Sequence, residues 1–226
     1  IERHGKYVFK NHISNLPMMT DSSFYDSLND IIEEYKIDLI FPTHDTVSLE
    51  FVKNQSKINT KVVAGDLHTV NICSSKKATY ELFADCDFVP KQYSLNTDTL
   101  EFPLFIKPDV GQGSVGAKKI LTYADLDNIK LEEYVITEFL SGDEYTVDCI
   151  TDKYGKLAYY SPRSRNRMMA GVCVSGKTED ASNEIRSIAE TINSRLNFLG
   201  LWYFQIKKDD KGKYKLLEIS SRCAGT

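Results

Sequence analysis

Apolar side chains recur every three or four residues between 22 and 36, a spacing that predicts an amphipathic helix. The apolar positions on this stripe are Phe24, Leu28, Ile31, Ile32 and Tyr35. Ser22 or Ser23 is the expected N-cap, because a hydroxyl accepts a hydrogen bond from a free backbone N–H of the first turn. The apolar run 37–41 then predicts a short buried strand, which ends at Pro42.

Helices and strands continue to alternate up to about residue 74. Asp45 is the expected cap of a helix that reaches about Lys53, and the run 61–65 predicts a second strand. Strands that alternate with helices are typical of a parallel α/β layer. We therefore expect such a layer over 1–74.

Beyond residue 74 strands predominate. The predicted strands are 102–108, 117–121, 134–139, 144–151, 157–160, 201–207 and 214–219, and the predicted helices are 76–84 and 182–196. Ser74 or Ser75 is the expected cap of the first of these helices, and Thr122 with Asp125 resembles a capping box. The last two strands form a hairpin, and antiparallel strands beside helices indicate an α+β region.

A glycine loop of the form G-x-G-x-x-G occupies residues 111–116 and lies between two predicted strands. A dinucleotide-binding fingerprint has to open a helix, whereas strand, loop and strand is the geometry of a flap that folds over nucleotide phosphates. Lys107 lies four residues before the loop. A nucleotide flap is the favoured interpretation, and a dinucleotide site and a structural turn are the alternatives.

Composition narrows the class of protein. The chain has 226 residues, with 28 Lys+Arg against 32 Asp+Glu and a net charge of −4, which argues against a dedicated nucleic-acid binder. No apolar run approaches the roughly 18 residues of a membrane span. The five cysteines and four histidines are scattered, so we expect a cytoplasmic protein without a zinc or disulfide framework. The chain begins at Ile1 and closes on a loop-like stretch, 220–226, as expected for part of a longer protein.

Six segments, taken in order, resemble the ATP-grasp superfamily of ligases, and most closely the branch similar to the large subunit of carbamoyl-phosphate synthase. They are Asp38–Asp45, Ser75–Tyr80, Phe105–Gly116, Val135–Asp148, Pro162–Arg165 and Leu216–Arg222. Each segment alone is a weak motif, and their order and spacing together are specific.

The resemblance implies a two-part fold, α/β followed by α+β. Residues 1–74 would form the pre-ATP-grasp domain, without its first strand–helix–strand unit. Residues 75–226 would form the ATP-grasp domain, with a lid over about 90–139 and a truncated C-terminal part.

The resemblance also implies a nucleotide site. Lys76 and Lys107 would contact ATP phosphates, beneath a glycine loop that contributes Gly111, Gly113, Ser114 and Gly116. Glu138, Phe139 and Leu140 would form the hinge at the adenine edge, and Glu144 would hold the ribose hydroxyls. Lys76 as a solvated helix lysine and Glu144 as a surface ion pair are the alternatives.

Gln205 and Glu218, on the two arms of the terminal hairpin, correspond to a pair that coordinates Mg²⁺ in the family; Mn²⁺ can take the same ligands. Ser220 stands where the family usually has Asn, and Arg222 would lie near the transferred phosphate. The alternating arginines Arg163, Arg165 and Arg167 share one face of an extended chain, as an anion-binding comb or as a solvated edge.

The function that the resemblance implies is an Mg-dependent carboxylate–amine ligase. ATP would phosphorylate a small carboxylate to an acylphosphate, and an amine would displace phosphate to form a C–N bond, leaving ADP. We expect no nucleic-acid or membrane partner, and a homo-oligomer is compatible with the sequence. Two alternatives remain: an ATP-binding module without catalysis, and a dinucleotide-dependent oxidoreductase.

Overall fold

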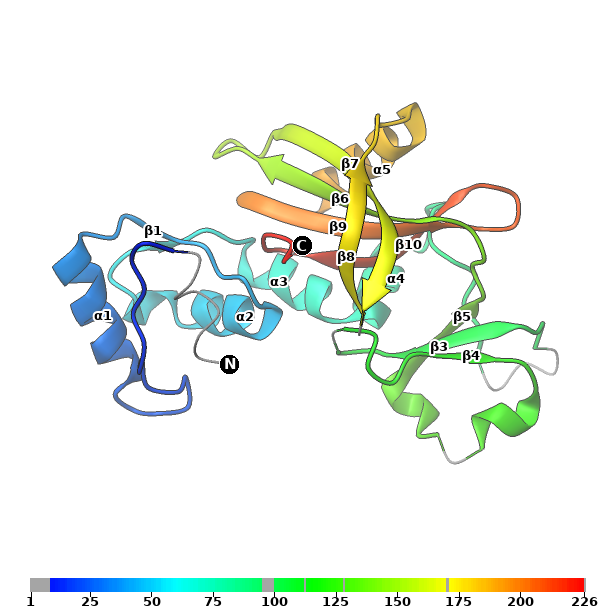
Figure 1. Cartoon of the computed structure of the whole chain (residues 1–226), viewed down its shortest axis with the longest axis horizontal. Helices are drawn as coiled ribbons and strands as arrows, with labels where there is room; N and C mark the ends of the chain where they lie inside the picture. The colour runs from blue at the N-terminus through cyan, green and yellow to red at the C-terminus, as the bar shows by residue number, and fades with distance from the viewer. Residues whose placement is uncertain (1–8, 95–99, 112, 128, 170, 226) are drawn as a thin grey trace.

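The computed structural model describes residues 9–225, apart from 95–99, 112, 128 and 170. Gln112 of the predicted glycine loop therefore lies outside the described residues. The elements form three groups: a helical N-terminal unit, a small three-stranded sheet and a large five-stranded sheet (Figure 1).

The N-terminal unit is a small parallel α/β layer, as the sequence predicts. Its elements are α1 (Phe24–Tyr35), β1 (Leu39–Ile40), α2 (Asp45–Lys53), the 3-10 turn η2 (Gln55–Lys57), β2 (Lys61–Val62) and α3 (Leu67–Ser74). β1 and β2 pair in parallel, with Leu39 opposite Lys61. α1 buries Phe24, Leu28 and Ile32 in a cluster that includes Phe51 of α2.

Some local expectations for this unit are wrong. Ser23 precedes α1 but its side chain does not cap the helix; the Ser23 backbone N–H donates to Asp21 Oδ1 at 2.9 Å. Tyr35 is 49% exposed, because it lies beyond the buried face of α1. The predicted strand 37–41 shrinks to two residues and Leu39 is 47% exposed, since a sheet of two strands covers little surface.

Asp45 is the first residue of α2 rather than its cap. His44 is the cap, and its Nδ1 accepts a hydrogen bond from Thr46 N at 3.3 Å. α3 was not predicted, and it begins after Asp66, whose carboxylate accepts from Thr69 N at 2.8 Å. Thr69 in turn accepts from the backbone N–H of Asn197, and this bond ties the unit to the rest of the chain.

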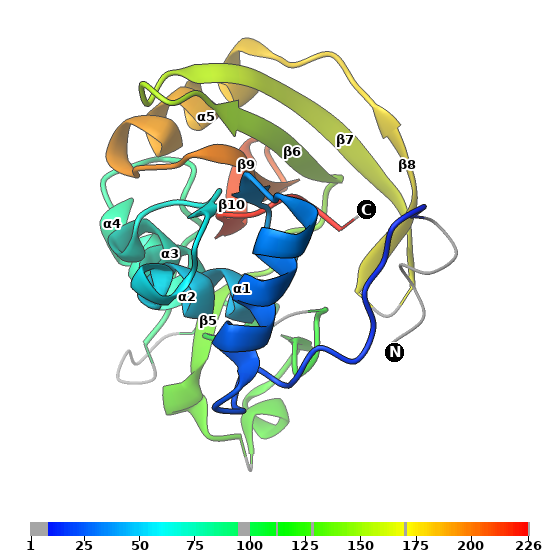
Figure 2. The same ribbon diagram turned by 90° about the vertical axis from the view of Figure 1, so that its left-hand side faces the viewer.

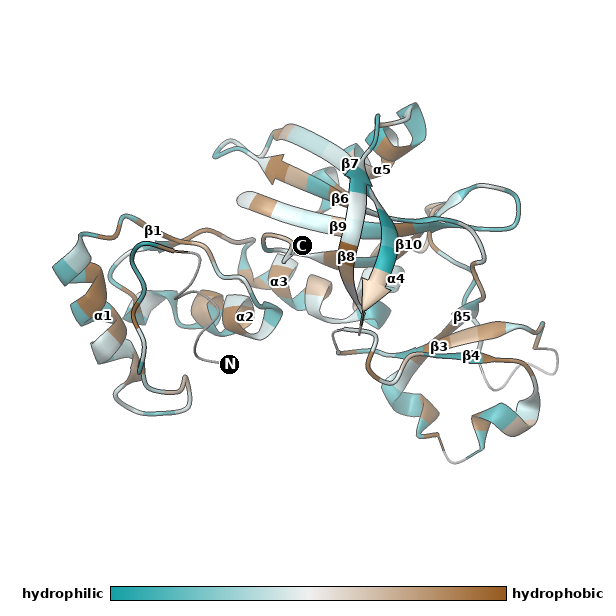
Figure 3. Ribbon diagram, in the orientation of Figure 1, coloured by the Kyte–Doolittle hydropathy of each residue, from teal (hydrophilic) through white to brown (hydrophobic). Residues whose placement is uncertain are grey.

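The small sheet is antiparallel with the order β4-β3-β5. Its strands are β3 (Leu104–Pro108), β4 (Lys118–Ile120) and β5 (Tyr134–Glu138), and two 3-10 turns, η3 (Tyr123–Leu126) and η4 (Leu131–Glu133), accompany them. Leu104, Ile106, Ile120 and Ile136 form its core, and Figure 3 shows the resulting brown positions along this sheet. Asp125 accepts from Thr122 N at 3.0 Å, as the predicted capping box requires.

The large sheet is antiparallel with the order β10-β9-β6-β7-β8 and arches over the molecule (Figure 2). Its strands are β6 (Glu144–Thr151), β7 (Leu157–Met169), β8 (Val172–Thr178), β9 (Gly200–Lys208) and β10 (Tyr214–Ser220). α5 (Asn183–Arg195), with Ile185, Ile188 and Ile192, packs into the core against the apolar face of this sheet. β7 is far longer than the predicted strand 157–160, and β8 was not predicted.

α4 (Lys76–Leu82) lies next to α3 and β10. Ser75 caps it as predicted, since its hydroxyl accepts from Ala78 N at 3.1 Å. Among the described helices, none combines the length and the apolar character that a membrane crossing requires.

Candidate functional site

A cleft lies between the two sheets and the N-terminal end of α4. It consists of two adjoining cavities, of about 760 and 130 Å³, which share wall residues. The shared residues are Lys76, Gly111, Gly113, Arg165, Gly171, Gln205 and Glu218. The sequence predicted five of these seven residues for the nucleotide and metal site and a sixth, Arg165, for an anion comb.

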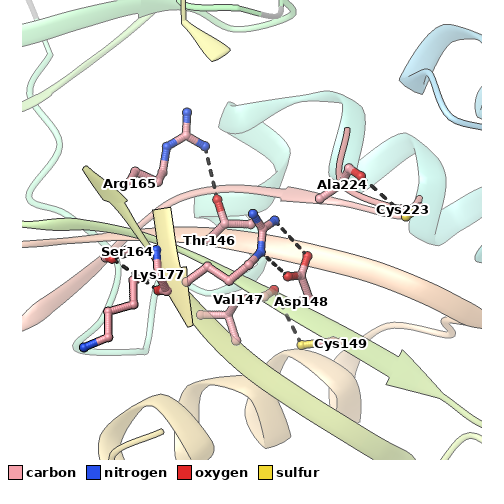
Figure 4. A network of polar contacts seen from close by, with 10 residues as sticks. Thr146, Val147, Asp148, Cys149, Ser164, Arg165, Lys177, Cys223 and Ala224 are labelled. Atoms are coloured by element: carbon pink, nitrogen blue, oxygen red, sulfur yellow. Dashed lines mark hydrogen bonds and ion pairs between the residues drawn. The ribbon is translucent and has the colours of Figure 1, made fainter. Parts of the chain in front are cut away.

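One face of the large sheet supplies the polar wall of the cleft. Thr146 of β6 pairs with Gln205 of β9, and Gln205 pairs with Glu218 of β10, so these residues form one row across three strands. Figure 4 shows Thr146 and Asp148 on this face, whereas Val147 and Cys149 point toward α5. The alternation of β6 therefore divides its side chains between the cleft and the core.

Lys107 ends β3 and reaches the cleft from the small sheet. Its side chain is buried, its Nζ donates to the Leu217 carbonyl at 2.7 Å, and it lines the smaller cavity. Burial lowers the pKa of Lys107 to about 8, although the charges of Glu218 and Glu144 oppose this shift. An anion that binds beside this buried ammonium would stabilise its charged form.

Lys76 opens α4 and lies against the start of the glycine loop. Its Nζ donates to the carbonyl oxygens of Asp109 at 3.1 Å and Gly111 at 3.4 Å. The Asp109 carboxylate accepts from Lys77 N at 2.8 Å, which holds the loop to the first turn of the helix. Burial lowers the pKa of Lys76 and the charge of Lys107 lowers it further, while Glu218 opposes the shift. The expected alternative, a solvated helix lysine, does not describe this environment.

The glycine loop has the backbone that its composition predicts. Gly113, Ser114 and Gly116 all have positive φ values, of 65°, 59° and 77°. Gly111, Gly113 and Ser114 line the smaller cavity. Gly116 lies outside the lining, and a Cβ added there would approach Pro108 to 3.0 Å.

The tip of the β7–β8 hairpin touches this loop. Gly171 has φ of 76°, and a Cβ added to it would overlap the carbonyl group of Gly113. Arg165 holds the tip, since its guanidinium donates to Gly171 O at 3.2 Å. The same guanidinium donates to Thr146 Oγ1 at 3.1 Å (Figure 4). The hairpin and the glycine loop thus close one side of the cleft together.

Gln205 and Glu218 offer a divalent cation two oxygen ligands at the cleft. They are direct partners in the β9–β10 ladder, so both side chains leave the same face, as the sequence predicts. Both are half-buried rather than fully buried, because they line the cleft. The described residues contain no cluster of three His, Cys, Asp or Glu side chains, so a cation here would need further oxygen ligands from substrate or water.

The predicted adenine hinge borders the cleft without lining either cavity. Glu138 Oε1 accepts from the Lys91 backbone N–H at 2.8 Å. The Phe139 ring lies 6.5 Å from that of Phe105, which does line the smaller cavity, and Leu140 is buried. The side chain of Glu138 therefore serves the fold, and so does its backbone N–H, which donates to Lys91 O at 3.0 Å.

Glu144 lines the smaller cavity and is also engaged in ion pairs. Its carboxylate lies 2.9 Å from Arg165 Nε and 3.7 Å from Lys207 Nζ. The Arg165 side chain is only 7% exposed, so this pair is not a surface ion pair. Glu144 therefore makes part-buried ion pairs rather than the surface ion pair given as the alternative, and its ribose role stays a prediction.

The arginines of β7 do not form a continuous comb. Arg163 pairs with Asp148 and lies outside the lining of both cavities, whereas Arg165 lies inside it. The β7–β8 register shifts between Arg165 and Arg167, which interrupts the strand alternation that placed all three on one face.

Arg222 lines the larger cavity together with residues of the N-terminal unit. Its guanidinium donates to both carboxylate oxygens of Asp45 at 2.8 Å and lies 5.4 Å from the centre of the Tyr203 ring. The Ser220 hydroxyl also donates to Asp45, at 2.5 Å. The role of Asp45 was missed, since the sequence marks it only as a helix cap.

Comparison with known proteins agrees with this architecture. Residues 130–226 match a family described as "ATP-grasp in the biosynthetic pathway with Ter operon". A D-alanine–D-alanine ligase from Buchnera aphidicola subsp. Schizaphis graminum is 29% identical over an alignment of 138 residues, and the match covers 54% of this chain and 45% of the ligase. The chain spans about half the length of the curated relatives it matches.

Solved structures share the fold over nearly the whole chain. The L-amino acid ligase from Bacillus licheniformis superposes with a TM-score of 0.70 at 16% identity, covering 94% of this chain and 56% of the ligase. The biotin carboxylase domain of Hydrogenobacter thermophilus 2-oxoglutarate carboxylase was solved with MgADP and bicarbonate. It superposes with a TM-score of 0.72 at 13% identity, covering 99% of this chain and 56% of that domain. The narrower likeness to the carbamoyl-phosphate synthase branch stays a prediction.

Proposed function

This chain is an ATP-grasp superfamily protein, and from that premise we propose that it binds Mg-ATP in the cleft and acts as a carboxylate–amine ligase. The observation that carries the proposal is one juxtaposition. Lys76 and Lys107, from a helix and a strand, face the Gln205–Glu218 pair beneath a glycine loop. Cations, oxygen ligands and a backbone flap are the groups that a triphosphate with its metal requires.

The roles of the residues follow from their chemistry. The two lysines would contact phosphate oxygens, and the loop N–H groups would cover them. Glu144 would accept hydrogen bonds from the ribose hydroxyls, and the backbone of 138–140 would meet the adenine edge. Glu218 and Gln205 would hold Mg²⁺ or Mn²⁺, which supplies neutralisation of the negative charge on the phosphates.

The reaction needs no covalent enzyme nucleophile. A carboxylate oxygen of the first substrate attacks the γ-phosphorus, and the bond to the bridging oxygen breaks to release ADP. The amine nitrogen of the second substrate then attacks the acyl carbon of the acylphosphate, phosphate leaves, and the nitrogen loses a proton. Arg222 lines the larger cavity together with Gln205 and Glu218, and there it would face the transferred phosphate.

The two alternatives differ in what the cleft would bind or turn over. A dinucleotide-dependent oxidoreductase requires a helix directly after the glycine loop, and β4 occupies that place. An ATP-binding module without catalysis shares the cleft, and only turnover separates it from a ligase.

The full-length protein tests the proposal. We expect a non-hydrolysable ATP analogue to bind, and phosphate release to require both a carboxylate and an amine from an amino-acid panel. With an ¹⁸O-labelled carboxylate, one labelled oxygen should appear in the phosphate, because the acyl C–O bond breaks. Binding without turnover across the panel would favour the module, and binding of a nicotinamide cofactor instead of ATP would favour the oxidoreductase.

A further inference from the structure

Tyr80 lies one helical turn after Lys76, on the same side of α4. Its side chain is fully buried, and its hydroxyl donates to the carbonyl oxygens of Leu216 at 3.2 Å and Leu217 at 3.0 Å. Two side chains of α4 therefore contact different parts of the cleft wall: Lys76 contacts the glycine loop, and Tyr80 contacts the backbone of β10.

The two carbonyl groups belong to a β-bulge. The β9–β10 register shifts between Leu216 and Glu218, so that Leu217 has no partner in the ladder. A bulged residue leaves backbone groups that need donors from elsewhere, and buried carbonyl groups are rarely left without one. Here the donors are the Tyr80 hydroxyl and the Lys107 ammonium, which lies 2.7 Å from Leu217 O.

The bulge determines where Glu218 points. Without the extra residue, the alternation of β10 would turn Glu218 to the opposite face, toward the core. With it, Glu218 stands opposite Gln205 on the cleft face. The Lys107 ammonium lies 5.4 Å from the centre of the Tyr80 ring, so the same side chain also supports the buried cation.

We propose that Tyr80 is a positioning residue that fixes the bulge at Leu217, and thereby orients Glu218 for a divalent cation and Lys107 for phosphate. The inference rests on the function proposed above for the cleft. Tyr80 itself touches neither phosphate nor metal: it acts on the backbone that carries the ligand.

The variant Tyr80→Phe retains the ring and removes only the hydroxyl. We expect the Mg²⁺ concentration that half-maximally tightens binding of a non-hydrolysable ATP analogue to rise by about ten-fold, while metal-free binding of the analogue stays nearly unchanged. Amide exchange over 214–220 should also accelerate, in the absence of any ligand. Tyr25→Phe is the matched control, since it removes a tyrosine hydroxyl that donates to Glu50 at 2.8 Å in the N-terminal unit. It should change neither readout.

The outcomes separate this inference from the proposed function. If the wild type does not bind the analogue, the proposed function fails, and accelerated exchange in β10 would still support the role of Tyr80 in fixing the bulge. If the wild type shows Mg²⁺-dependent binding and Tyr80→Phe matches it in both readouts, the inference is overturned. Hydrogen exchange in the wild type gives a further test without any variant. The Leu216 amide donates to Phe88 O at 2.7 Å, and it should exchange as slowly as the amides of the central strands. Fast exchange there would also overturn the inference.

Discussion

Asp45 and Arg222 are 177 positions apart in the chain and form a two-point ion pair at the wall of the larger cavity. The Arg222 side chain is only 11% exposed, so this carboxylate compensates the cost of burying its charge. The pair joins the first turn of α2 to the segment that follows β10. The N-terminal unit thereby fixes the arginine that would face the transferred phosphate.

We expect Asp45→Asn to lower the free energy of unfolding by about 1.5–3 kcal/mol, because charge-assisted hydrogen bonds to a part-buried guanidinium are lost. Urea denaturation measures this change. The variant should also lose turnover while its affinity for an ATP analogue changes little, since the lysines are untouched.

Asp85→Asn is the matched control for this pair. Asp85 makes an equally direct two-point pair with Arg195, at 2.6 and 2.7 Å, but its carboxylate is 67% exposed. Solvent screening makes such pairs weak, so we expect a much smaller change in stability and none in turnover. Equal losses in the two variants would contradict the role given to Asp45.

We expect Lys107→Ala to weaken binding of an ATP analogue by about 10- to 100-fold, as the loss of a charge-assisted contact predicts. Lys118→Ala is the control: Lys118 is exposed on β4, and its Nζ donates to Asp125 O at 3.2 Å. Lys119 is a poor control, since it lies 4.0 Å from the centre of the Phe139 ring of the predicted hinge. Calorimetric titration gives both affinities, and similar values for the two variants would remove Lys107 from the phosphate site.

The pKa of Lys107, about 8 in the free protein, predicts a pH dependence of nucleotide binding. Phosphate favours the ammonium form, so bound nucleotide raises this pKa, and affinity is full below about pH 8 and falls as the pH rises through it. Binding near pH 8.5 should therefore take up protons, which calorimetry in buffers of different ionisation enthalpy detects. Lys107→Arg should greatly reduce this uptake, because a guanidinium stays charged; Lys76 accounts for any uptake that persists. An uptake equal to that of the wild type would contradict the assignment.

The sequence predicts best those elements that carry their own apolar periodicity. α1, α5 and β3 each show a clear stripe or run, and the structure confirms them close to their expected bounds. β8 and the distal half of β7 were missed because residues 163–167 and 175–178 carry no large apolar side chain on either face, so no apolar alternation marks them. α3 was missed because only Thr69 and Val70 are buried along it, and its neighbours rather than its own pattern hold it in place.

The residues of the candidate site also fall into two groups, those that the sequence indicates and those that it does not. Lys107, the glycine loop and the Gln205–Glu218 pair meet at the cleft, and the sequence could indicate them because each is local in sequence or lies on a predicted hairpin; their roles stay predictions. The partner of Arg222 was not found, since nothing in the sequence links it to a residue near the N-terminus. Tyr80 and the bulge at Leu217 were also missed, because a register shift of one residue leaves no mark on the hydropathy pattern.

We expect Gly171→Ala to weaken binding of an ATP analogue by roughly ten-fold, because the added methyl group overlaps the Gly113 carbonyl and must push the loop away. Gly155→Ala is the matched control. Gly155 also has a positive φ, of 80°, but a Cβ added there meets nothing within 4 Å. The control therefore carries the backbone strain alone. Equal affinities for the two variants would show that the hairpin tip does not set the position of the loop.

Glu218→Gln should lower turnover severely while it largely spares metal-free nucleotide affinity. The substitution keeps the shape of the side chain and removes its charge, and Lys76 and Lys107 remain to hold the phosphates. The loss then falls on the chemical step, by about 10²- to 10³-fold, since neutralisation of developing charge is a large contribution to phosphoryl transfer. Gln205→Ala should act in the same direction more weakly, because a neutral amide oxygen is the poorer ligand.

Substrate-dependent phosphate release from the full-length protein measures turnover, beside an analogue titration with and without Mg²⁺ for each variant. Glu81→Gln is the control, an exposed glutamate on α4 that lines neither cavity. In Glu218→Gln the Mg²⁺-dependent gain in affinity should shrink together with turnover, because both depend on the same ligand. A variant that turns over like an active wild type would contradict the metal site. A variant that loses metal-free nucleotide binding as well would place Glu218 in the scaffold of the cleft instead, since removal of one metal ligand leaves the lysines in place.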